Sequence, residues 1–315
     1  MNDTTVYDLA IIGGGVAAMS CALYSGRYKM STIMFTDSFG GVTATAHLIC
    51  NYPGFLEVTG MDLMSKMTEQ VTNLKIPIHY EKVMDIKKEN DLFIVNSDQR
   101  AIKAKKILLA IGKKKRNLNI EDEDKFLGKG VHYCATCDGA FYKDKIVGVI
   151  GGSDAAVTAA LLLSDIAKKV YIIYRGTSLR AEPMWLDSLH KQKNVEILYN
   201  SEISKLIGSE KLEKIILKDN KEIILDGIFI EIGHVPNIDL LEKLNIRLDD
   251  FGEIIVDKEQ RTNVSGVFAA GDCTNHTELK QIVTSTSQGA IASYFIFKDL
   301  KANESKNIHN NQSIY

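Results

Sequence analysis

Two glycine-rich turns constrain the fold of this chain more than any other feature. The first follows the apolar run Val6–Ile12, and its residues 13–18 (GGGVAA) fit the pattern G-x-G-x-x-A. The second follows the apolar run 146–150, with residues 151–156 (GGSDAA) at the corresponding places. An apolar run that enters a glycine turn and then a helical stretch is typical of a dinucleotide-binding unit with a buried parallel strand. The sequence therefore predicts an α/β protein with two Rossmann-like, three-layer, parallel-sheet domains.

The residues of the first turn have separate expected roles. Gly13 permits the tight turn, Gly15 lets the backbone approach a pyrophosphate, and the small Ala18 lets the helix pack closely on the strand. The pyrophosphate then faces the helix N-terminus, where unpaired N–H groups and the helix dipole favour an anion. A second strand is expected over 32–35, and Asp37 follows it near the place of a ribose-binding carboxylate.

A further part of the pattern lies near the C-terminus. An apolar strand over 266–270 ends in Gly271 and Asp272. The Asp272 carboxylate can meet a sugar or ribityl hydroxyl, with a backbone N–H against a phosphate, although a helix N-cap is an alternative role for this residue. A helix rich in small residues is expected from Gln281 and Ile282 onward, and its start can press onto a flat ring.

The order of these segments predicts a discontinuous first domain. The C-terminal segment completes the first dinucleotide fold, so the second fold is inserted into it. Loop signals at 112–116 and 233–237 mark the expected crossings. We therefore expect a first domain of residues 1–115 and 245–315 and a second of residues 116–244.

The chemistry-bearing motif is a pair of close cysteines, Cys134 and Cys137, followed directly by Asp138. Two thiols separated by two residues can close and reopen a disulfide, which suits electron transfer. Asp138 supplies a proton donor within reach of a nascent thiolate. Half of a zinc site and two unconnected thiols are the alternatives, but zinc needs four ligands, and the other three cysteines are isolated from one another.

Composition excludes several classes of protein. A length of 315 residues with 45% hydrophobic content is typical of two ordinary globular domains. A net charge of -2 argues against a nucleic-acid partner. Neither a signal peptide nor an apolar run long enough to span a membrane is expected. Five cysteines, two of them in a reactive pair, fit a reducing cytoplasm.

Together these segments resemble the low-molecular-weight flavin thioredoxin reductases over nearly the whole chain. The resemblance rests on the first glycine turn, the cysteine motif and three shorter stretches. These stretches are Asn51-Tyr52-Pro53-Gly54, Ile232-Gly233-His234-x-Pro236-Asn237 and Val267-Phe268-Ala269-Ala270-Gly271-Asp272. Their order and spacing make the likeness specific.

The resemblance implies a homodimer in which each chain holds FAD and passes electrons through the cysteine pair to thioredoxin. Residues 1–115 and 245–315 then form the FAD-binding domain. Residues 116–244 form an NAD(P)H-binding-like domain that carries the disulfide and rotates between two orientations. Cys137 is expected nearer to the flavin, because it adjoins the proton shuttle Asp138. The implied catalytic residues are Cys134, Cys137 and Asp138, and the implied FAD-binding residues are Gly13, Gly15, Ala18, Asp37, Gly41, Asn51, Gly271, Asp272, Gln281 and Ile282.

The second glycine turn departs from the family pattern. Ser153 stands where a glycine lets a pyrophosphate come close, and Asp154 adds a carboxylate at the helix start, where the cofactor's own charge goes. A fixed anion a few ångströms from a pyrophosphate costs on the order of a few kcal/mol. The family's H-R-R-x-x-x-R clamp for the 2′-phosphate of NADPH reads Tyr174-Arg175-Gly176-x-x-x-Arg180, so one arginine is missing.

These departures make the chain similar to relatives that lack both motifs and take electrons from reduced ferredoxin. We therefore expect ferredoxin as the electron donor, with NADPH as the alternative. An acidic ferredoxin would dock on a basic patch, and the densest one lies at 113–116, with Lys103, Lys105 and Lys106 nearby in sequence. A solvated loop is the alternative interpretation of this cluster.

Two other classes of function remain open from the sequence. A ferredoxin–NADP oxidoreductase of similar fold has no use for the cysteine pair, and a redox-sensing or assembly protein would keep FAD only structurally. The polar tail at 306–315 is typical of an unstructured terminus, and its Tyr315 is a candidate cover for an exposed flavin face.

Overall fold

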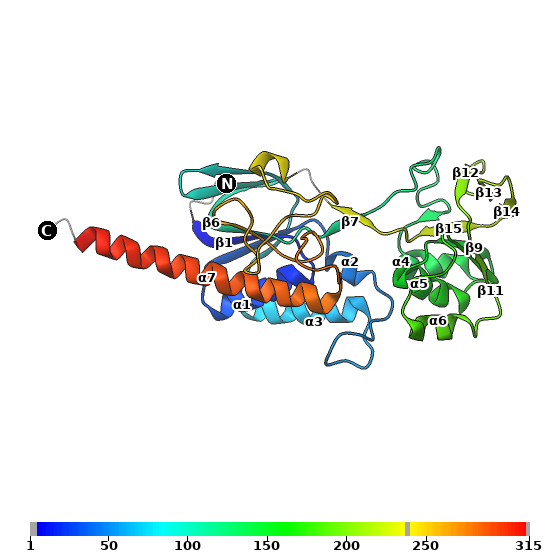
Figure 1. Ribbon diagram of the computed structural model, residues 1–315, viewed down its shortest axis with the longest axis horizontal. Helices are drawn as coiled ribbons and strands as arrows, with labels where there is room; N and C mark the ends of the chain where they lie inside the picture. The colour runs from blue at the N-terminus through cyan, green and yellow to red at the C-terminus, as the bar shows by residue number, and fades with distance from the viewer. Residues whose placement is uncertain (1–4, 237–239, 313–315) are drawn as a thin grey trace. The chain divides into compact units, whose positions relative to one another are not determined.

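The computed structural model describes residues 5–236 and 240–312. The chain divides into two compact units, which Figure 1 colours along the sequence. Unit 1 comprises Met1–Ala44, Cys50–Lys113 and Pro236–Tyr315, and unit 2 comprises Thr45–Ile49 and Lys114–Val235. The long segment of unit 2 lies between two parts of unit 1 in the sequence, so one fold is inserted into the other.

Unit 1 is built on a sheet in the order β3-β2-β1-β6-β5-β4, with β17 also paired to β6. Strands β1, β2, β3, β6 and β17 are parallel, and β4 and β5 extend the sheet with antiparallel pairing. The central strands are almost continuously apolar because helices and loops bury them on both faces. The strands are β1 (Val6–Ile12), β2 (Thr32–Thr36), β3 (Ile78–Tyr80), β4 (Val83–Glu89), β5 (Leu92–Ser97), β6 (Ala101–Leu109) and β17 (Val267–Ala269).

The helices of unit 1 are organised around α1, which packs against both α3 and α7 (Figure 1). Gly289 permits the close approach of α7, since a Cβ there would lie 2.1 Å from the Ala17 carbonyl oxygen. The expected polar tail differs from an unstructured terminus, because α7 continues as far as Gln312; Tyr315 lies outside the described residues. The helices are α1 (Val16–Arg27), α2 (Gly41–Ala44), α3 (Gly60–Asn73), α7 (Ile282–Gln312) and the short 3-10 helix η2 (Glu242–Leu244).

Unit 2 contains a parallel five-stranded sheet in the order β11-β10-β9-β15-β8 and a separate antiparallel sheet β12-β13-β14. Two apolar cores lie against the parallel sheet, and one includes α5 while the other includes the three antiparallel strands. The strands are β8 (Val131–His132), β9 (Ile146–Ile150), β10 (Lys169–Ile173), β11 (Val195–Leu198), β12 (Ile203–Ile207), β13 (Lys214–Leu217), β14 (Glu222–Ile224) and β15 (Gly227–Ile230). The helices are α4 (Ala135–Asp138), η1 (Gly139–Tyr142), α5 (Asp154–Ser164) and α6 (Pro183–Leu189).

The two crossing segments differ from the loops that the sequence predicts. They pair with each other as strands β7 (Lys113–Lys115) and β16 (His234–Pro236). The chain rejoins unit 1 at Pro236 rather than at residue 245, because leucines of the following segment pack into the core of unit 1. These leucines are Leu240, Leu241 and Leu244.

Both units thus have the parallel sheet flanked by helices that defines a Rossmann-like domain, and the predicted fold class is confirmed. Within residues 5–236 and 240–312, no helix combines the length and apolar character needed to cross a membrane.

Candidate active site

The first glycine turn is shaped by the packing of unit 1 itself. Gly13 has a φ of +127°, and its N–H donates to the Phe35 carbonyl at 2.7 Å. A Cβ at Gly13 would lie 2.1 Å from the Ala110 carbonyl oxygen, which is impossible without backbone movement. Glycine is therefore required at this position by the fold, with or without a ligand.

Gly15 differs, because the fold does not require a glycine there. It is the N-cap of α1 with φ -81°, and a Cβ on it would meet no atom of the described residues within 4 Å. Gly41 lies beside it, since a Cβ built on Gly41 would lie 3.5 Å from the Cα of Gly15. The N-cap Gly15 has no side chain to cap the first turn of α1, and a helix start of this kind leaves N–H groups that can meet an anion. Open space bounded by glycines at a helix start fits a dinucleotide pyrophosphate.

The Gly271–Asp272 element lies beside α7. Gly271 has a φ of +88°, and its N–H donates to the buried Gln288 side chain at 2.6 Å. Asp272 accepts a 2.9 Å hydrogen bond from the Ser285 hydroxyl. A turn follows Asp272 and α7 begins only at Ile282, so the N-cap alternative for Asp272 does not hold. Gln288 and Ser285 of α7 are thus hydrogen-bond partners of the predicted site residues Gly271 and Asp272, and the sequence alone did not single them out.

Three further predicted cofactor residues, Asp37, Asn51 and Gln281, fall into two places. Asn51 Nδ2 donates to Gln281 Oε1 at 3.2 Å, which joins the Asn51 loop to the residue before α7. Asp37 is exposed directly after β2 and accepts a hydrogen bond from Ser38 at 3.2 Å. The structure therefore brings Asn51 and Gln281 together and places Asp37 at the end of the strand next to the glycine turn.

In unit 2, Cys134 and Cys137 form a disulfide with a Cα–Cα distance of 5.3 Å. Cys134 is the N-cap of α4, and its Sγ accepts the Cys137 N–H at 3.1 Å. Because a disulfide-bonded pair offers no thiolate to zinc, this state supports redox chemistry over half of a zinc site. Cys137 is exposed and Cys134 partly so.

Asp138 belongs to a chain of side chains that the sequence reasoning missed. Its Oδ2 lies 2.9 Å from Nδ1 of His132, and His132 Nε2 lies 2.7 Å from the Tyr142 hydroxyl. His132 is buried, and its ring stacks on Phe229 at 5.3 Å. Burial, with smaller contributions from Asp138 and Asp226, raises the pKa of Tyr142 to about 12. The only sequence signal was a histidine two residues before the first cysteine.

The second glycine turn keeps the backbone of the first. Gly151 has a φ of +143°, and a Cβ there would lie 2.2 Å from the Glu231 carbonyl oxygen. Ser153 is the N-cap of α5 and makes no capping hydrogen bond with its side chain. Asp154 Oδ1 accepts the Glu182 N–H at 2.7 Å, which holds its carboxylate near the helix start.

A tyrosine ring lies against this second turn. A Cβ at Gly152 would be 2.7 Å from the ring of Tyr174, and a Cβ at Gly176 would be 2.6 Å from Cε1 of the same ring. Tyr174 is buried, whereas Arg175 and Arg180 are exposed. The residue that stands in place of the histidine of the phosphate clamp therefore packs on the turn itself.

The predicted basic patch is largely neutralised. Lys113 pairs with Glu253 at 2.5 Å, Lys115 with Glu231 at 3.2 Å and Lys105 with Asp8 at 2.7 Å. Lys106 is half-buried, and burial lowers its pKa. Lys103, Lys114 and Arg116 are exposed, so the patch is smaller than the sequence predicts.

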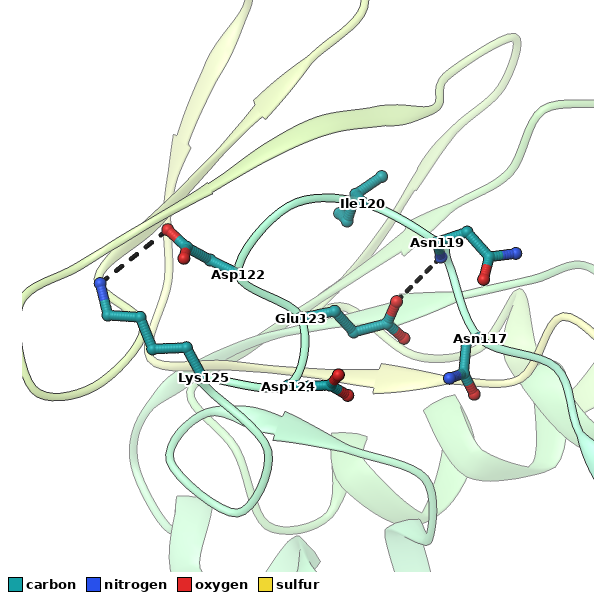
Figure 2. Close-up of a pocket in the computed structure, with 7 residues that line it drawn as sticks. All are labelled: Asn117, Asn119, Ile120, Asp122, Glu123, Asp124 and Lys125. Atoms are coloured by element: carbon teal, nitrogen blue, oxygen red, sulfur yellow. Dashed lines mark hydrogen bonds and ion pairs between the residues drawn. The ribbon is translucent and has the colours of Figure 1, made fainter.

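One hollow in unit 2, of about 370 Å³, lies on the loop 117–125 (Figure 2). Its central carboxylate, Glu123, accepts the Leu118 and Asn119 N–H groups at 3.0 and 2.8 Å and the Tyr133 hydroxyl. The buried Glu123 thus stabilises the loop, and none of the predicted site residues lines the hollow.

Comparisons with known proteins agree with this geometry. A family model described as pyridine nucleotide-disulphide oxidoreductase matches residues 7–289. A thioredoxin reductase of Peptoclostridium acidaminophilum is 38% identical over 95% of this chain and 98% of its own. The Lactococcus lactis thioredoxin reductase structure matches with a TM-score of 0.89 and 33% identity, over 93% of this chain and 98% of that one. A ferredoxin–flavin thioredoxin reductase structure from Clostridium acetobutylicum matches with a TM-score of 0.53 and 32% identity, over 94% of this chain and 99% of that one.

The chain belongs to the pyridine nucleotide-disulphide oxidoreductase family, whose model spans both units. Within that family it is a flavoprotein oxidoreductase of the low-molecular-weight thioredoxin reductase type. The resemblance and the oxidoreductase class predicted from the motifs are therefore confirmed.

Proposed function

We propose that this chain reduces thioredoxin, with FAD bound to unit 1 and the Cys134–Cys137 pair of unit 2 as the relay. The disulfide supports the relay, and the open glycine cradle at Gly15 supports the cofactor. When bound, the flavin would supply the two-electron redox chemistry that links the electron donor to the disulfide. The protein supplies the binding site, the sulfur pair and the protons.

The proposed FAD site uses the residues that surround the cradle. Gly13, Gly15, Ala18 and Gly41 would hold the pyrophosphate at the start of α1, and Asp37 would meet the ribose hydroxyls. The flavin side of the site would be formed by Asn51, Gly271, Asp272, Gln281 and Ile282. The hydrogen bond between Asn51 and Gln281 supports this grouping.

The thiol half of the reaction follows from the cysteine geometry. In the dithiol state, one cysteine thiolate attacks the thioredoxin disulfide and forms a mixed disulfide with it. The other cysteine of the pair then attacks its partner's sulfur and displaces thioredoxin as the dithiol. The Cys134–Cys137 bond reforms, and thioredoxin has taken two electrons. The Cys137 N–H donates to Cys134 Sγ, and such a donor stabilises a thiolate. Asp138 gives and takes the proton.

We propose reduced ferredoxin as the electron donor. The observation that carries this donor is Ser153 at the helix start, in the place of the open Gly15. The buried Tyr174 ring supports it, because it packs on Gly152, where the first turn has the smaller Thr36 against Gly14, and it also covers Gly176. The Asp154 carboxylate, held by the Glu182 N–H, adds a negative charge at the same helix start. These residues fit a pyridine dinucleotide poorly, and the named ferredoxin-dependent enzyme of Clostridium acetobutylicum is a precedent among similar chains.

NADPH is the second candidate donor. Gly151 keeps the tight turn, and Arg175 and Arg180 remain exposed for a 2′-phosphate. Stopped-flow reduction of the flavin by NADPH, NADH and reduced ferredoxin, compared with the rate of thioredoxin turnover, separates the two donors. Full reduction by micromolar NADPH at the turnover rate would show that ferredoxin is not the required donor.

The relay is tested by Cys134→Ser and Cys137→Ser. Each variant should keep a reducible flavin and lose thioredoxin turnover by about a thousandfold or more, because a single thiol cannot release thioredoxin through a second exchange. Turnover retained in both variants would remove the pair from the reaction.

We propose a homodimer in the cytoplasm, where Cys21, Cys50 and Cys273 stay unpaired. Sedimentation velocity of the FAD-loaded chain tests the assembly, and a monomer at micromolar concentration would contradict it.

A further inference from the structure

The histidine between the cysteine motif and the unit 2 core has no role in the reaction described so far. His132 ends β8, two residues before Cys134, and lies opposite Phe229 of the neighbouring strand β15. It is buried with both ring nitrogens at hydrogen-bond distance from other side chains. A buried imidazole with two polar partners is held in one orientation.

The partner on the far side of the ring fixes which nitrogen carries the proton. Burial raises the pKa of Tyr142 to about 12, so its hydroxyl stays protonated at neutral pH and can donate to His132 Nε2. A neutral imidazole that accepts at Nε2 carries its proton on Nδ1. The Nδ1–H then donates to Asp138 Oδ2 across the observed 2.9 Å.

The tyrosine is itself fixed by its surroundings. Gly227 leaves room for it, since a Cβ there would lie 2.5 Å from the Tyr142 ring. Lys145 Nζ lies 5.3 Å from the ring centroid, and Asp226 is the other carboxylate that acts on its hydroxyl. The ring also meets His132 and Phe229 edge-on. The chain from Tyr142 to Asp138 therefore rests on packed core and not on a mobile loop.

We propose that His132 is a positioning residue for the proton shuttle Asp138, with Tyr142 setting its tautomer. This inference rests on the proposed function, because it assigns Asp138 the protons of the Cys134–Cys137 reaction. When a reductant breaks the S–S bond, its electron pair passes to the sulfurs, and the sulfur that leaves takes a proton from the Asp138 carboxyl group. The Nδ1–H keeps its hydrogen bond to Oδ2 before and after this transfer, so the proton leaves from the other carboxyl oxygen, Oδ1, and returns to it when the dithiol is oxidised again.

A matched pair of substitutions separates this role from simple core packing. In His132→Asn the side-chain amide occupies the place of Nδ1 and can still donate to Asp138. In His132→Gln the amide reaches the place of Nε2, so the Tyr142 contact is kept and the Asp138 contact is lost. Both variants bury one neutral amide, and Tyr142→Phe removes only the donor to Nε2.

The first measurement needs neither flavin nor thioredoxin. Dithiothreitol reduces the Cys134–Cys137 disulfide, its own dithiol being oxidised to the cyclic disulfide, and timed alkylation counts the thiols formed. His132→Gln should slow this reduction about tenfold, whereas His132→Asn should stay within about threefold of wild type. Flavin content and thermal unfolding of each variant show that the fold is kept.

A double-mutant cycle then tests whether His132 acts through Asp138. In the Asp138→Asn background, His132→Gln should cause no further slowing, since the group that it positions is gone. Equal slowing by the Asn and Gln variants, or a full tenfold loss in the Asp138→Asn background, would overturn the proposal.

Nitrogen-15 NMR shows directly which imidazole nitrogen of His132 carries the proton, and the wild-type spectrum alone tests the proposed tautomer. The Nδ1–H tautomer is expected, with a shift toward a mixed population in Tyr142→Phe. A proton on Nε2 in wild type would exclude the proposed donor. Failure of the proposed function is distinct, because it would appear as absent thioredoxin turnover in wild type with normal disulfide reduction by dithiothreitol.

Discussion

The two glycine turns of this chain have the same backbone and different surroundings. Gly13 and Gly151 each donate to the end of the neighbouring strand, at 2.7 and 3.1 Å, and each would collide with a carbonyl oxygen if it carried a Cβ. The turns diverge at the next positions. Gly15 faces open space, whereas its counterpart is Ser153. The side chain on the middle glycine also differs, since Thr36 lies against Gly14 and the larger Tyr174 ring lies against Gly152.

This difference separates two reasons for glycine in one motif. The glycine at the start of the turn, Gly13 or Gly151, is required by strand and turn packing and is kept in both units. The glycine at the helix N-cap is required only by a ligand, and it is kept as Gly15 in unit 1 but replaced by Ser153 in unit 2. A turn can therefore keep its fold after the residues that fit a nucleotide have changed.

The largest expected effects come from the shared position. Gly13→Ala and Gly151→Ala should each lower the free energy of unfolding of their own unit by about 3 kcal/mol, from strain at positive φ and the carbonyl collision. Only Gly13→Ala should also remove FAD. The single tryptophan, Trp185, lies in unit 2, so its fluorescence in urea reports the unfolding of that unit. Far-ultraviolet circular dichroism of the FAD-free protein follows both units, and flavin absorbance after purification measures the FAD retained. Equal loss of FAD in both variants would contradict a separate role for the two turns.

The next effect tests the position that diverges. Gly15→Ser copies the second turn into the first and should weaken FAD binding about 30-fold, or about 2 kcal/mol, because the side chain enters the open cradle. Urea unfolding of the FAD-free protein should not change, since the backbone at φ -81° accepts serine. Ser153→Gly is the matched control and should leave FAD affinity unaltered. FAD binding of Gly15→Ser at wild-type strength would show that the pyrophosphate lies elsewhere.

The reverse exchange should restore part of a nucleotide site in unit 2. Ser153→Gly, Asp154→Asn and Gly176→Arg remove the crowding and the charge and rebuild the clamp, but a side chain at 176 collides with the Tyr174 ring. The set therefore needs Tyr174→His as well. The quadruple variant should bind NADPH about tenfold more tightly than wild type by titration calorimetry. The triple variant without Tyr174→His should gain less affinity. No gain in either would remove the turn as the cause of weak binding.

The smallest expected effect concerns the residue whose carbonyl oxygen lies against the first glycine of each turn. This residue is Ala110 in unit 1 and Glu231 in unit 2. Burial raises the pKa of Glu231, and Lys115 opposes that shift. A carboxyl group with a raised folded pKa contributes stability at low pH that is lost as the pH rises through that pKa. Wild-type unit 2 should therefore lose stability relative to Glu231→Gln as the pH rises above about 4.5, the ordinary value. Trp185 fluorescence during thermal unfolding measures the stability of unit 2 at each pH. Parallel pH profiles for wild type and Glu231→Gln would contradict the prediction.

Much of the fold followed from local patterns. Apolar runs of strand length and glycines after them predicted β1, β9 and the parallel sheets, because a buried parallel strand needs a continuous apolar sequence. The crossings were predicted as loops, but they pair as β7 and β16. Such short strands have no signal of their own, since their partner lies more than a hundred residues away in the sequence.

The candidate site was predictable in its motif residues and not in their neighbours. The disulfide between Cys134 and Cys137 and the hydrogen bond between Asn51 and Gln281 join residues that the sequence singled out. The lysines at 113 and 115 carried a clear charge signal, but their partners Glu253 and Glu231 are distant in sequence. The basic patch is therefore smaller than the charge pattern predicts, because these ion pairs neutralise Lys113 and Lys115.

The sequence by itself determined the two dinucleotide folds, the redox pair and the family, because each depends on residues a few positions apart whose backbone chemistry is local. Only the tertiary structure decided what surrounds them. The Tyr174 ring lies on the second turn because β10 pairs with β9, and strand order sets that contact. The Asp138–His132–Tyr142 chain joins residues six and ten positions apart, but its rings pack on Phe229 of the distant strand β15, which no spacing near the cysteines encodes.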